Sequence, residues 1–522
     1  MNIGEWVYKR ALLYPERTFL KQAGEGVDNR RFNEQVNRTA HAFQDLGLNR
    51  GDRVAVLMAN SGEFLEVLFA CAKLGLMMVP LNTQLAVSEL NYILEDADPQ
   101  ILIYTAGFSD KVASIKTAQT GIRAFFQHGE TATGVGADPS FSSLMSTCPF
   151  SEPIIEGEVD LRDALMILYT SGTTGDPKGA VLCHQNFLFG AIHSLIGYGI
   201  DESYVSLVVA PLFHIGALAA SVVPVVYAGG SLLIESFDNP SDIVELIVRE
   251  RVNYMFGVPV MFGLMTRSPR WADADFSHVH FFIAGGAPMP VPLIQKYQQE
   301  KSIRFAQGYG MTETLRIASL GLDDAVRKQG SVGKEVFNTF IRIIDEKGNE
   351  APAGGIGEIL VKGPTVFLHY WNKPEATAAA FQDGWFRTGD LGRRDEDRFL
   401  YIVGRKTDLI ISSGRNIYAT EVERAIQALP PVAEAAVVGE PDSKRGEIVV
   451  AYVRLKPEET PGKMIDEWAL IESLQGNIAP FKIPKKICFV TDFPRTGAGK
   501  ILKRCLSPQS TPLNQDGQDE KG

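Results

Sequence analysis

Residues 169–179 read YTSGTTGDPKG, and this stretch decides how the rest of the chain is interpreted. It follows an apolar run of the length expected for a buried strand. Its three glycines remove side-chain bulk, so backbone N–H groups can approach an anion, while hydroxyl groups and Lys178 add donors and positive charge. Polyphosphate is the natural ligand of such a loop. It differs from a Walker A loop because no Gly-Lys-Ser/Thr follows the first glycine at the required spacing.

Strand-like and helix-like segments alternate on both sides of this loop. The β-rich runs 53–58 and 77–81 flank a segment with helical spacing at 62–73. This alternation, which recurs from 165 to 307, predicts parallel sheets covered by helices. The expected strands of the second part are 165–170, 204–210, 231–236, 252–258, 278–284 and 304–307, with helices at 240–251 and 291–300. Three unusual segments, 170–179, 285–288 and 308–314, are expected beyond the carboxyl ends of strands, where open sheets bind ligands.

The pattern changes after about residue 330. Short β-type runs separated by turn signals predict an antiparallel, barrel-like subdomain over 331–403. The predicted fold is therefore α/β: residues 1–404 form a large N-terminal domain of two mostly parallel, helix-covered sheets plus this β-rich subdomain. Residues 405–507 are expected to form a small, mobile α+β domain, and 508–522 a disordered tail.

Composition narrows the partners and the compartment. The 51 Lys and Arg against 62 Asp and Glu give a net charge of −11 without a basic stripe, which argues against nucleic acid as a partner. Five scattered cysteines without CxxC spacing favour a reducing compartment and argue against a disulfide framework or a zinc site. The first residues show no secretory signal, so we expect a cytoplasmic protein. The oligomeric state is open, with a homodimer as one option.

One uncharged stretch, 205–234, is long enough to cross a bilayer. Two prolines and a Gly-Gly pair divide it into short pieces of strand, helix and strand. We therefore expect buried core and no membrane span.

Further motifs follow the phosphate loop in order. They are GGAP at 285–288, QGYGMTET at 307–314, GWFRTGD at 384–390, GRKTD at 404–408 and PRTGAGK at 494–500. Together they resemble the adenylate-forming superfamily, which contains acyl-CoA synthetases, firefly luciferase and the adenylation domains of nonribosomal peptide synthetases. The resemblance covers nearly the whole chain and is closest to fatty-acid–CoA ligases. It implies that a carboxylic acid and ATP form an acyl-adenylate, from which a thiol, usually coenzyme A, then displaces AMP.

The resemblance also implies which residues bind ATP and AMP. Glu313 would be the carboxylate of a Mg²⁺ site, Thr312 would contact phosphate, and Tyr309 would stack on adenine. Asp390 would accept hydrogen bonds from the ribose, assisted by Arg405. The full expected set is Thr170, Ser171, Gly172, Thr173, Thr174, Gly175, Lys178, Gly286, Ala287, Gly308, Tyr309, Gly310, Thr312, Glu313, Asp390, Arg405 and Lys500.

The mechanism that the resemblance implies depends on Lys500. The matching lysine of the family bridges the acyl carboxylate and the α-phosphate, which is electrostatic catalysis by a positioned cation. Because Lys500 belongs to the small domain, that domain must close for the first half-reaction and then move to admit the thiol. We expect the hinge at 405–407, where Thr407 replaces the usual Asp or Lys. The alternative is a solvated lysine near the tail.

The acyl and coenzyme A sites follow from the same resemblance. His214, Ile215 and Gly216 match the segment whose histidine gates the acyl site, and the absence of a nearby Asp argues against amino-acid activation. The predicted catalytic residues are Lys500, Lys178, His214 and Glu313. Those predicted to contact coenzyme A are Ser413, Gly414, Arg445 and Phe481.

The sequence leaves more than one hypothesis for the acid substrate. Apolar residues around 213–223 and 255–261 favour a fatty or largely apolar acid. Arg316 falls where relatives line the acyl pocket with small or amide side chains, so an aryl or dicarboxylic acid is the second hypothesis. An ion pair of Arg316 with a nearby Asp or Glu is an equal alternative. A luciferase-like oxygenase, an enzyme that loads a carrier protein and an inactive binding protein complete the alternatives.

Overall fold

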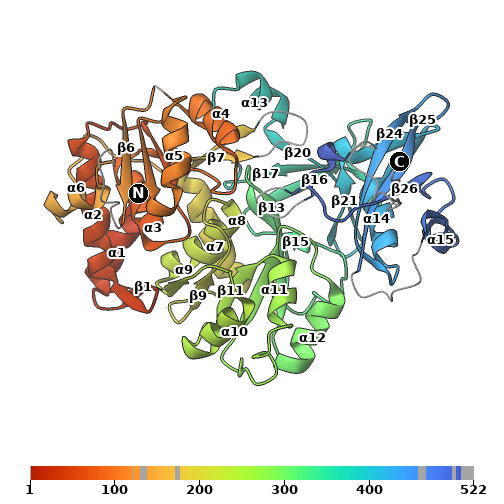
Figure 1. Ribbon diagram of the computed structural model, residues 1–522, viewed down its shortest axis with the longest axis horizontal. Helices are drawn as coiled ribbons and strands as arrows, with labels where there is room; N and C mark the ends of the chain where they lie inside the picture. Colours follow the sequence, from red (N-terminus) through yellow and green to blue (C-terminus); the bar gives the residue numbers. More distant parts are fainter. Residues whose placement is uncertain are drawn as a thin grey trace, which may run out of the picture.

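The computed structural model describes residues 2–119, 121–129, 138–170, 177–456, 466–495 and 501–506. Figure 1 shows the N-terminal sheet at the left, a second sheet below the centre, a β-rich subdomain at the centre and the C-terminal lobe at the right. Ser171–Gly175 and Lys500, which the sequence analysis assigns to the site, lie outside the described residues.

The first sheet has seven strands in its described part, in the order β18-β8-β7-β4-β3-β5-β6. Strands β7, β4, β3, β5 and β6 run parallel, while β8 and β18 are antiparallel additions at one edge. Their bounds are β18 His369–Tyr370, β8 Lys178–Cys183, β7 Ala164–Thr170, β4 Met77–Pro80, β3 Arg53–Leu57, β5 Ile101–Thr105 and β6 Ala124–His128.

The second sheet has nine strands in the described residues, in the order β15-β14-β13-β12-β11-β9-β10-β1-β2. The strands from β13 to β1 are parallel, and the two ends of the sheet are antiparallel hairpins. The bounds are β15 Lys334–Glu335, β14 Leu315–Leu320, β13 Phe305–Met311, β12 Phe281–Gly285, β11 Tyr254–Gly257, β9 Val205–Val208, β10 Ser231–Ile234, β1 Thr18–Gln22 and β2 Glu25–Asp28. The expected α/β architecture with mostly parallel sheets is confirmed.

Helices fill the space between the sheets. Every residue of α3 (Gly62–Leu74) except Glu63 is buried, and α3 shares one continuous core with α7 (His184–Tyr198) and strands of both sheets. Helix α3 begins at Ser61, whose Oγ accepts from Phe64 N at 3.3 Å, and ends at Gly75 in the left-handed region. The other helices of the large domain are α1 Gly4–Leu13, α2 Asn29–Asp45, α4 Val87–Ala97, α5 Ser109–Lys116, α6 Phe141–Thr147, α10 Pro240–Arg249, α11 Pro259–Met265, α12 Val291–Lys301 and α13 Pro374–Ala380.

The uncharged stretch folds as short elements. Between β9 and β10 it forms α8 (Ile215–Ala217), the π-helical turn η2 (Leu218–Val222) and α9 (Val223–Ala228). In the part of the chain that the structure describes, none of the helices has both the length and the apolar character needed to cross a bilayer. The prediction of strand, helix and strand pieces is confirmed.

One expectation about the 308–314 motif is wrong. It was expected as a loop beyond a strand that ends at 307, but β13 continues to Met311 and turns directly into β14. Glycine permits this close hairpin, because a Cβ at Gly310 would lie 1.7 Å from the backbone oxygen of Leu315. The motif is therefore held as a strand and a tight turn.

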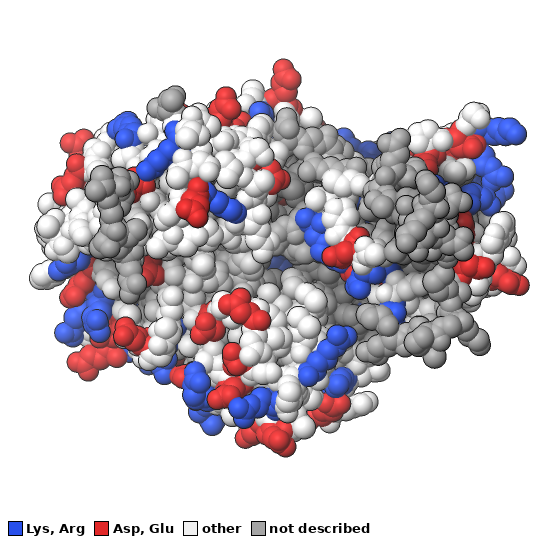
Figure 2. Space-filling model, viewed as in Figure 1, with Lys and Arg blue, Asp and Glu red and all other residues white. Residues whose placement is uncertain are grey.

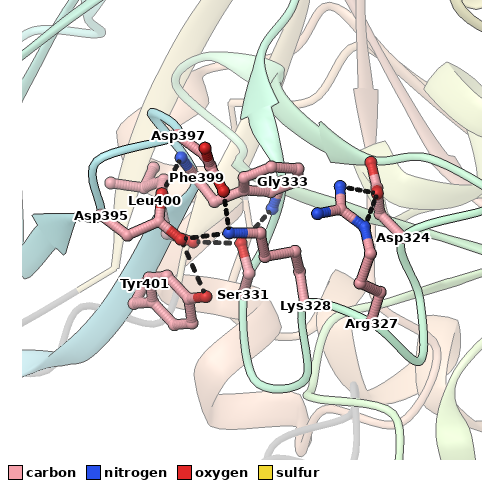
Figure 3. A network of polar contacts seen from close by, with 10 residues as sticks. All are labelled: Asp324, Arg327, Lys328, Ser331, Gly333, Asp395, Asp397, Phe399, Leu400 and Tyr401. Carbon is pink, nitrogen blue, oxygen red and sulfur yellow. Dashed lines mark hydrogen bonds and ion pairs between the residues drawn. The ribbon is translucent and has the colours of Figure 1, made fainter.

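The β-rich subdomain is an antiparallel sheet in the order β16-β17-β20-β19, with β21 paired to β20. Its bounds are β16 Phe340–Ile344, β17 Gly357–Lys362, β19 Phe381–Gln382, β20 Trp385–Arg394 and β21 Leu400–Arg405. Lys328, which lies between the second sheet and this subdomain, forms ion pairs with Asp395 at 2.9 Å and Asp397 at 2.5 Å (Figure 3). This contact holds the β20–β21 turn against the segment between β14 and β15 of the second sheet.

The C-terminal lobe has its own sheet, β23-β22-β25-β24, with β26 parallel to β25. Its elements are η3 Lys406–Asp408, β22 Leu409–Ser412, β23 Arg415–Tyr418, α14 Ala419–Gln427, β24 Val432–Asp442, β25 Gly446–Leu455, α15 Glu467–Ser473 and β26 Lys486–Phe489. A separate apolar cluster, with members such as Ile417, Val422 and Val437, packs between this sheet and its helices. On the face shown in Figure 2, basic and acidic side chains are interspersed.

Candidate active site

Tyr370 links two predicted site residues that are far apart in sequence. It lies in β18, opposite Ala180 of β8, and its hydroxyl donates to Glu313 Oε1 at 2.9 Å. Lys178, the first residue of β8, places its Nζ 5.3 Å from the centre of the Tyr370 ring. The end of the phosphate loop and the acidic motif therefore meet at one tyrosine. The sequence analysis missed Tyr370, because a lone tyrosine in a two-residue strand produces no pattern.

Glu313 is a carboxylate in an apolar setting. Its residue surface is 7% exposed, and burial raises its pKa, while the hydrogen bond from Tyr370 and the charge of Arg405 oppose this rise. Within the described residues, no group of three or more His, Cys, Asp or Glu side chains could hold a metal ion. One carboxylate nevertheless fits Mg²⁺, which proteins commonly bind through one or two carboxylates while phosphate and water supply the other oxygens.

Tyr309, Asp390 and Arg405 form a second group. The Tyr309 hydroxyl donates to Asp390 Oδ2 at 2.6 Å, and Arg405 Nε lies 3.2 Å from Asp390 Oδ1. The ladder between β20 and β21 places Asp390 directly opposite Arg405. Burial and the Asp390 charge raise the pKa of Tyr309, so its phenol is neutral. The structure brings together the three residues predicted for adenine and ribose.

Glycines at the end of β12 and within β13 keep the sheet surface free of side chains. Gly285 pairs with Gly308, and Gly286 follows with φ +77°, exposed beside Ala287. Thr170 ends β7, with its hydroxyl 3.4 Å from the Lys178 carbonyl that accepts its proton, and Thr312 is half-buried in the hairpin. Gly286 and Ala287 agree with the expected location beyond the carboxyl end of a parallel strand, whereas Gly308 lies inside β13.

The predicted acyl segment lies against the same glycines. A Cβ at Gly216 would lie 3.0 Å from Phe256 Cζ, and one at Gly285 would lie 2.7 Å from Phe256 Cε2, so the Phe256 ring packs between them. His214 precedes α8, with its ring centre 4.7 Å from that of Phe213, and Ile215 is half-buried. The Phe256 ring therefore lies between the acyl segment and Gly285, the last residue of β12.

Arg316 lies on β14, the strand that pairs with β13. Its Nη2 donates to Ser194 Oγ at 3.0 Å, and its guanidinium lies 4.5 Å from the centre of the Tyr198 ring. Among the residues that the structure describes, no Asp or Glu forms an ion pair with it, so the structural ion pair considered from sequence is wrong there.

The predicted coenzyme A residues share one end of the C-terminal lobe. Ser413 N donates to the Arg445 carbonyl at 2.7 Å, and Gly414 completes the turn with φ +73°. Phe481 lies 4.8 Å from the guanidinium of Arg415, the residue after that turn. Arg415 was missed from sequence, because nothing in the motif indicates that it stacks on Phe481.

The segment predicted as the hinge is the short helix η3. Thr407 Oγ1 donates to Asp408 Oδ1 at 3.2 Å, and Lys406 Nζ lies 3.3 Å from Glu358 Oε2 of β17. An ion pair therefore joins the lobe to the β-rich subdomain beside the backbone crossing, and Asn416 Nδ2 of the lobe donates to Glu346 Oε1 of the subdomain at 3.2 Å.

Comparison with protein families identifies the chain. Residues 7–371 match the AMP-binding enzyme family, and residues 421–500 match the AMP-binding enzyme C-terminal domain. The chain belongs to the AMP-binding enzyme family. This bears out the resemblance to adenylate-forming enzymes.

Curated relatives and solved structures agree with this assignment. Feruloyl-CoA synthase of Amycolatopsis sp is 36% identical over 96% of this chain and 98% of its own. Long-chain-fatty-acid–CoA ligase FadD13 of Mycobacterium tuberculosis is 37% identical, covering 97% and 98%. The 2-succinylbenzoate–CoA ligase of Bacillus cereus is 34% identical, covering 96% and 97%. MenE of Bacillus subtilis with ATP and a magnesium ion superposes with a TM-score of 0.85 at 31% identity, covering 96% and 98%.

The chain is therefore an AMP-forming acid–CoA ligase that uses ATP. Because the relatives are named for aromatic, fatty and succinylbenzoic acids, they leave the acid substrate open.

Proposed function

We propose that this site adenylates a carboxylic acid and passes the acyl group to coenzyme A, with the residues above in defined roles. The observation that carries the proposal is the meeting of Lys178 and Glu313 at Tyr370. A cation and a carboxylate on one tyrosine suit a triphosphate whose oxygens need both a protein cation and Mg²⁺.

In the first half-reaction a carboxylate oxygen of the acid attacks the α-phosphorus of ATP. The bond from that phosphorus to the β-phosphate oxygen breaks, and pyrophosphate leaves. Lys178 would neutralise phosphate charge, and Glu313 would hold Mg²⁺, whose contribution would be to stabilise charge on the phosphate oxygens. Tyr309 supports the adenine ring, and Asp390, oriented by Arg405, accepts from the ribose hydroxyls.

In the second half-reaction the thiol sulfur of coenzyme A attacks the acyl carbon. The carbon–oxygen bond to AMP breaks, AMP leaves, and the thiol proton is released to solvent. The turn at Ser413–Gly414, Arg445 and Phe481 would hold the coenzyme, since these residues gather at one end of the lobe. His214 would line the passage to the acyl site.

Domain movement is part of this proposal. Lys500 is the last residue of the matched C-terminal domain and would reach the carboxylate and the α-phosphate when the lobe closes about Thr407. Support for a hinge there comes from the short helix η3, beside which an ion pair between the exposed Lys406 and Glu358 and a hydrogen bond from Asn416 to Glu346 join the lobe to the subdomain. Rotation of the lobe would then withdraw Lys500 and admit the thiol.

The acid that we propose has a largely apolar body. Phe256 packs between the acyl segment and the sheet, and Phe213, directly before His214 of that segment, is buried. A fatty acid or an aryl acid fits this lining.

Pyrophosphate release across a panel of fatty, aryl and dicarboxylic acids tests the proposal. Release that needs an acid, with a thioester formed when coenzyme A is added, supports it. Oxygen consumption with light would point to a luciferase-like oxygenase, and a requirement for carrier protein in place of coenzyme A would point to a loading enzyme. No release with any acid would contradict the proposal.

A further inference from the structure

A group of polar side chains is buried between helix α7 and the second sheet, on the face that carries Phe256. Arg316 lies at its centre, held by Ser194 at 3.0 Å and by the face of Tyr198. Arg316 Nε is buried and forms no hydrogen bond with any described residue. The guanidinium therefore has donors to spare and no described carboxylate to neutralise it.

His193, the neighbour of Ser194 on α7, is the second polar group. It is 2% exposed, and neither ring nitrogen forms a hydrogen bond within the described residues. Burial, with a contribution from the Arg316 charge, lowers the pKa of His193 to about 4. The imidazole is thus neutral at physiological pH, with one N–H donor unused.

Two serine hydroxyls extend the group. Ser206 of β9 and Ser221 of η2 are fully buried, and neither has a hydrogen-bond partner among the described residues. Tyr254 connects them, because it lies opposite Ser206 in the sheet and donates to the carbonyl of Ala220, next to Ser221. The charge of Arg316 also acts on Tyr254.

Buried polar groups without partners are rare in folded proteins, since each loses its hydrogen bonds to water. Arg316 beside them is half-buried, and a cation in that setting without a described counter-ion adds to this cost. A pocket evolved only for a hydrocarbon tail would not collect four such groups on one face. The cluster has the composition of a subsite for an anion.

This cluster adjoins the acyl site. The Arg316 side chain packs on Gly308, where a Cβ would lie 3.3 Å from Arg316 Cδ. Gly308 pairs with Gly285, and Gly285 contacts the Phe256 ring that also borders the acyl segment. An acid that passes Phe256 would meet Arg316 at its far end.

We propose that Arg316, assisted by His193 and Ser194, binds a second carboxylate on the substrate, so that the enzyme acts on dicarboxylic acids with an apolar body. The inference rests on the proposed ligase reaction and specifies its acid. One carboxylate reacts with ATP while the other makes charge-assisted hydrogen bonds to the guanidinium.

Matched pairs of acids test the inference. Pyrophosphate release is measured for mono- and ω-dicarboxylic acids of equal chain length, with an apolar or aryl body. Wild type should show kcat/KM at least about 10-fold higher for the diacid, because a charge-assisted hydrogen bond is lost with the monoacid. Arg316→Met should lower the diacid value about 10- to 100-fold and leave the monoacid value unchanged or higher. Arg316→Lys should restore part of the preference.

Controls separate specificity from folding. Arg304→Met removes an arginine of the same sheet that forms an exposed ion pair with Asp323, and it should leave the ratio of the two acids unchanged. Arg316→Met should keep or raise the melting temperature without ligand, because it removes a half-buried cation that no described carboxylate neutralises. A structural arginine would instead lower it.

The outcomes are distinguishable. An unchanged diacid-to-monoacid ratio in Arg316→Met, or a wild type that prefers the monoacid, would overturn the inference and leave the ligase function standing. Absence of pyrophosphate release with every acid would overturn the ligase function itself.

Discussion

Tyr370 donates its phenolic hydrogen to Glu313 across 2.9 Å, although 57 positions separate the two residues in the chain. The Nζ of Lys178 lies over the ring of the same tyrosine. The edge strand β18 therefore joins the two segments that we propose bind phosphate and Mg²⁺. Burial raises the pKa of the Glu313 carboxyl, and the hydrogen bond from Tyr370 is one of the contacts that favour its ionised form.

Tyr370→Phe should lower the rate of adenylation about 10-fold while leaving the fold intact, since a hydrogen bond to a charged group is lost and the ring under Lys178 is kept. The hydrogen bond lowers the pKa of Glu313, so its loss moves that pKa further up. Ionised Glu313 is lost as the pH falls through this value, and the acidic limb of the pH–rate profile should shift to higher pH. Tyr401→Phe, which removes a hydroxyl bound to Asp395 at 3.3 Å, is the control. Identical profiles for the two variants would contradict the role of Tyr370.

Tyr309 combines a hydrogen bond to Asp390 with an aromatic face. Tyr309→Phe should weaken AMP binding about 5- to 10-fold, because Asp390 keeps only Arg405 to orient it. Tyr309→Leu should weaken it further, since the surface that stacks on adenine is lost as well. Titration calorimetry with AMP separates the two effects. Equal affinities for the Phe and Leu variants would exclude stacking.

The raised pKa of Glu66 predicts how the stability of the protein depends on pH. This residue of α3 is 6% exposed, and burial raises its pKa from 4.5 to about 8. Between these values the native state binds a proton that the unfolded state has released, so Glu66 contributes a fall in the free energy of unfolding as pH rises. Below about pH 6.5 buried histidines such as His193, whose pKa burial lowers to about 4, contribute a rise that opposes it. Glu66→Gln should remove this fall and be more stable than wild type by roughly 2–4 kcal/mol at about pH 8.

Urea denaturation across this pH range measures the effect. Glu95→Gln replaces an exposed carboxylate of α4 and should retain the pH dependence of wild type. A difference in stability between Glu66→Gln and wild type that stays constant over this pH range would contradict a protonated Glu66.

Lys500→Ala tests the domain-alternation proposal. Adenylation should fall by about 100-fold or more, because the cation that meets the developing charge is removed. Thioester formation from supplied acyl-adenylate should fall far less. The two half-reactions are measured separately, and equal losses in both would contradict alternation of the lobe.

Much of the site was predictable because its motifs carry their own chemistry. Each motif contains residue types whose chemistry indicates a role. Examples are the glycines and lysine of 172–179, the acidic residue of the β13–β14 hairpin and the charged residues of the GRKTD stretch. The alternation of apolar runs likewise predicted both sheets, since helix and strand periods are local properties. What failed was the end of β13, because its continuation depends on pairing with β14 rather than on its own residues.

The missed residues act only through tertiary contacts. Tyr370 gains its role from β18 pairing with β8, and His193 gains its role from α7 lying over Arg316. In sequence, His193 is one polar residue on an apolar helix. Arg316 itself stood out by type, but only the structure shows that its described neighbours include no carboxylate.

The most direct test of the central claim follows one oxygen atom. An acid accepted in the pyrophosphate screen is labelled with ¹⁸O in its carboxylate and turned over with ATP and coenzyme A. If the acid attacks the α-phosphorus and the thiol then displaces AMP, one labelled oxygen must appear in the AMP recovered. Label found in inorganic phosphate or pyrophosphate, with unlabelled AMP, would contradict an acyl-adenylate and with it the proposed mechanism.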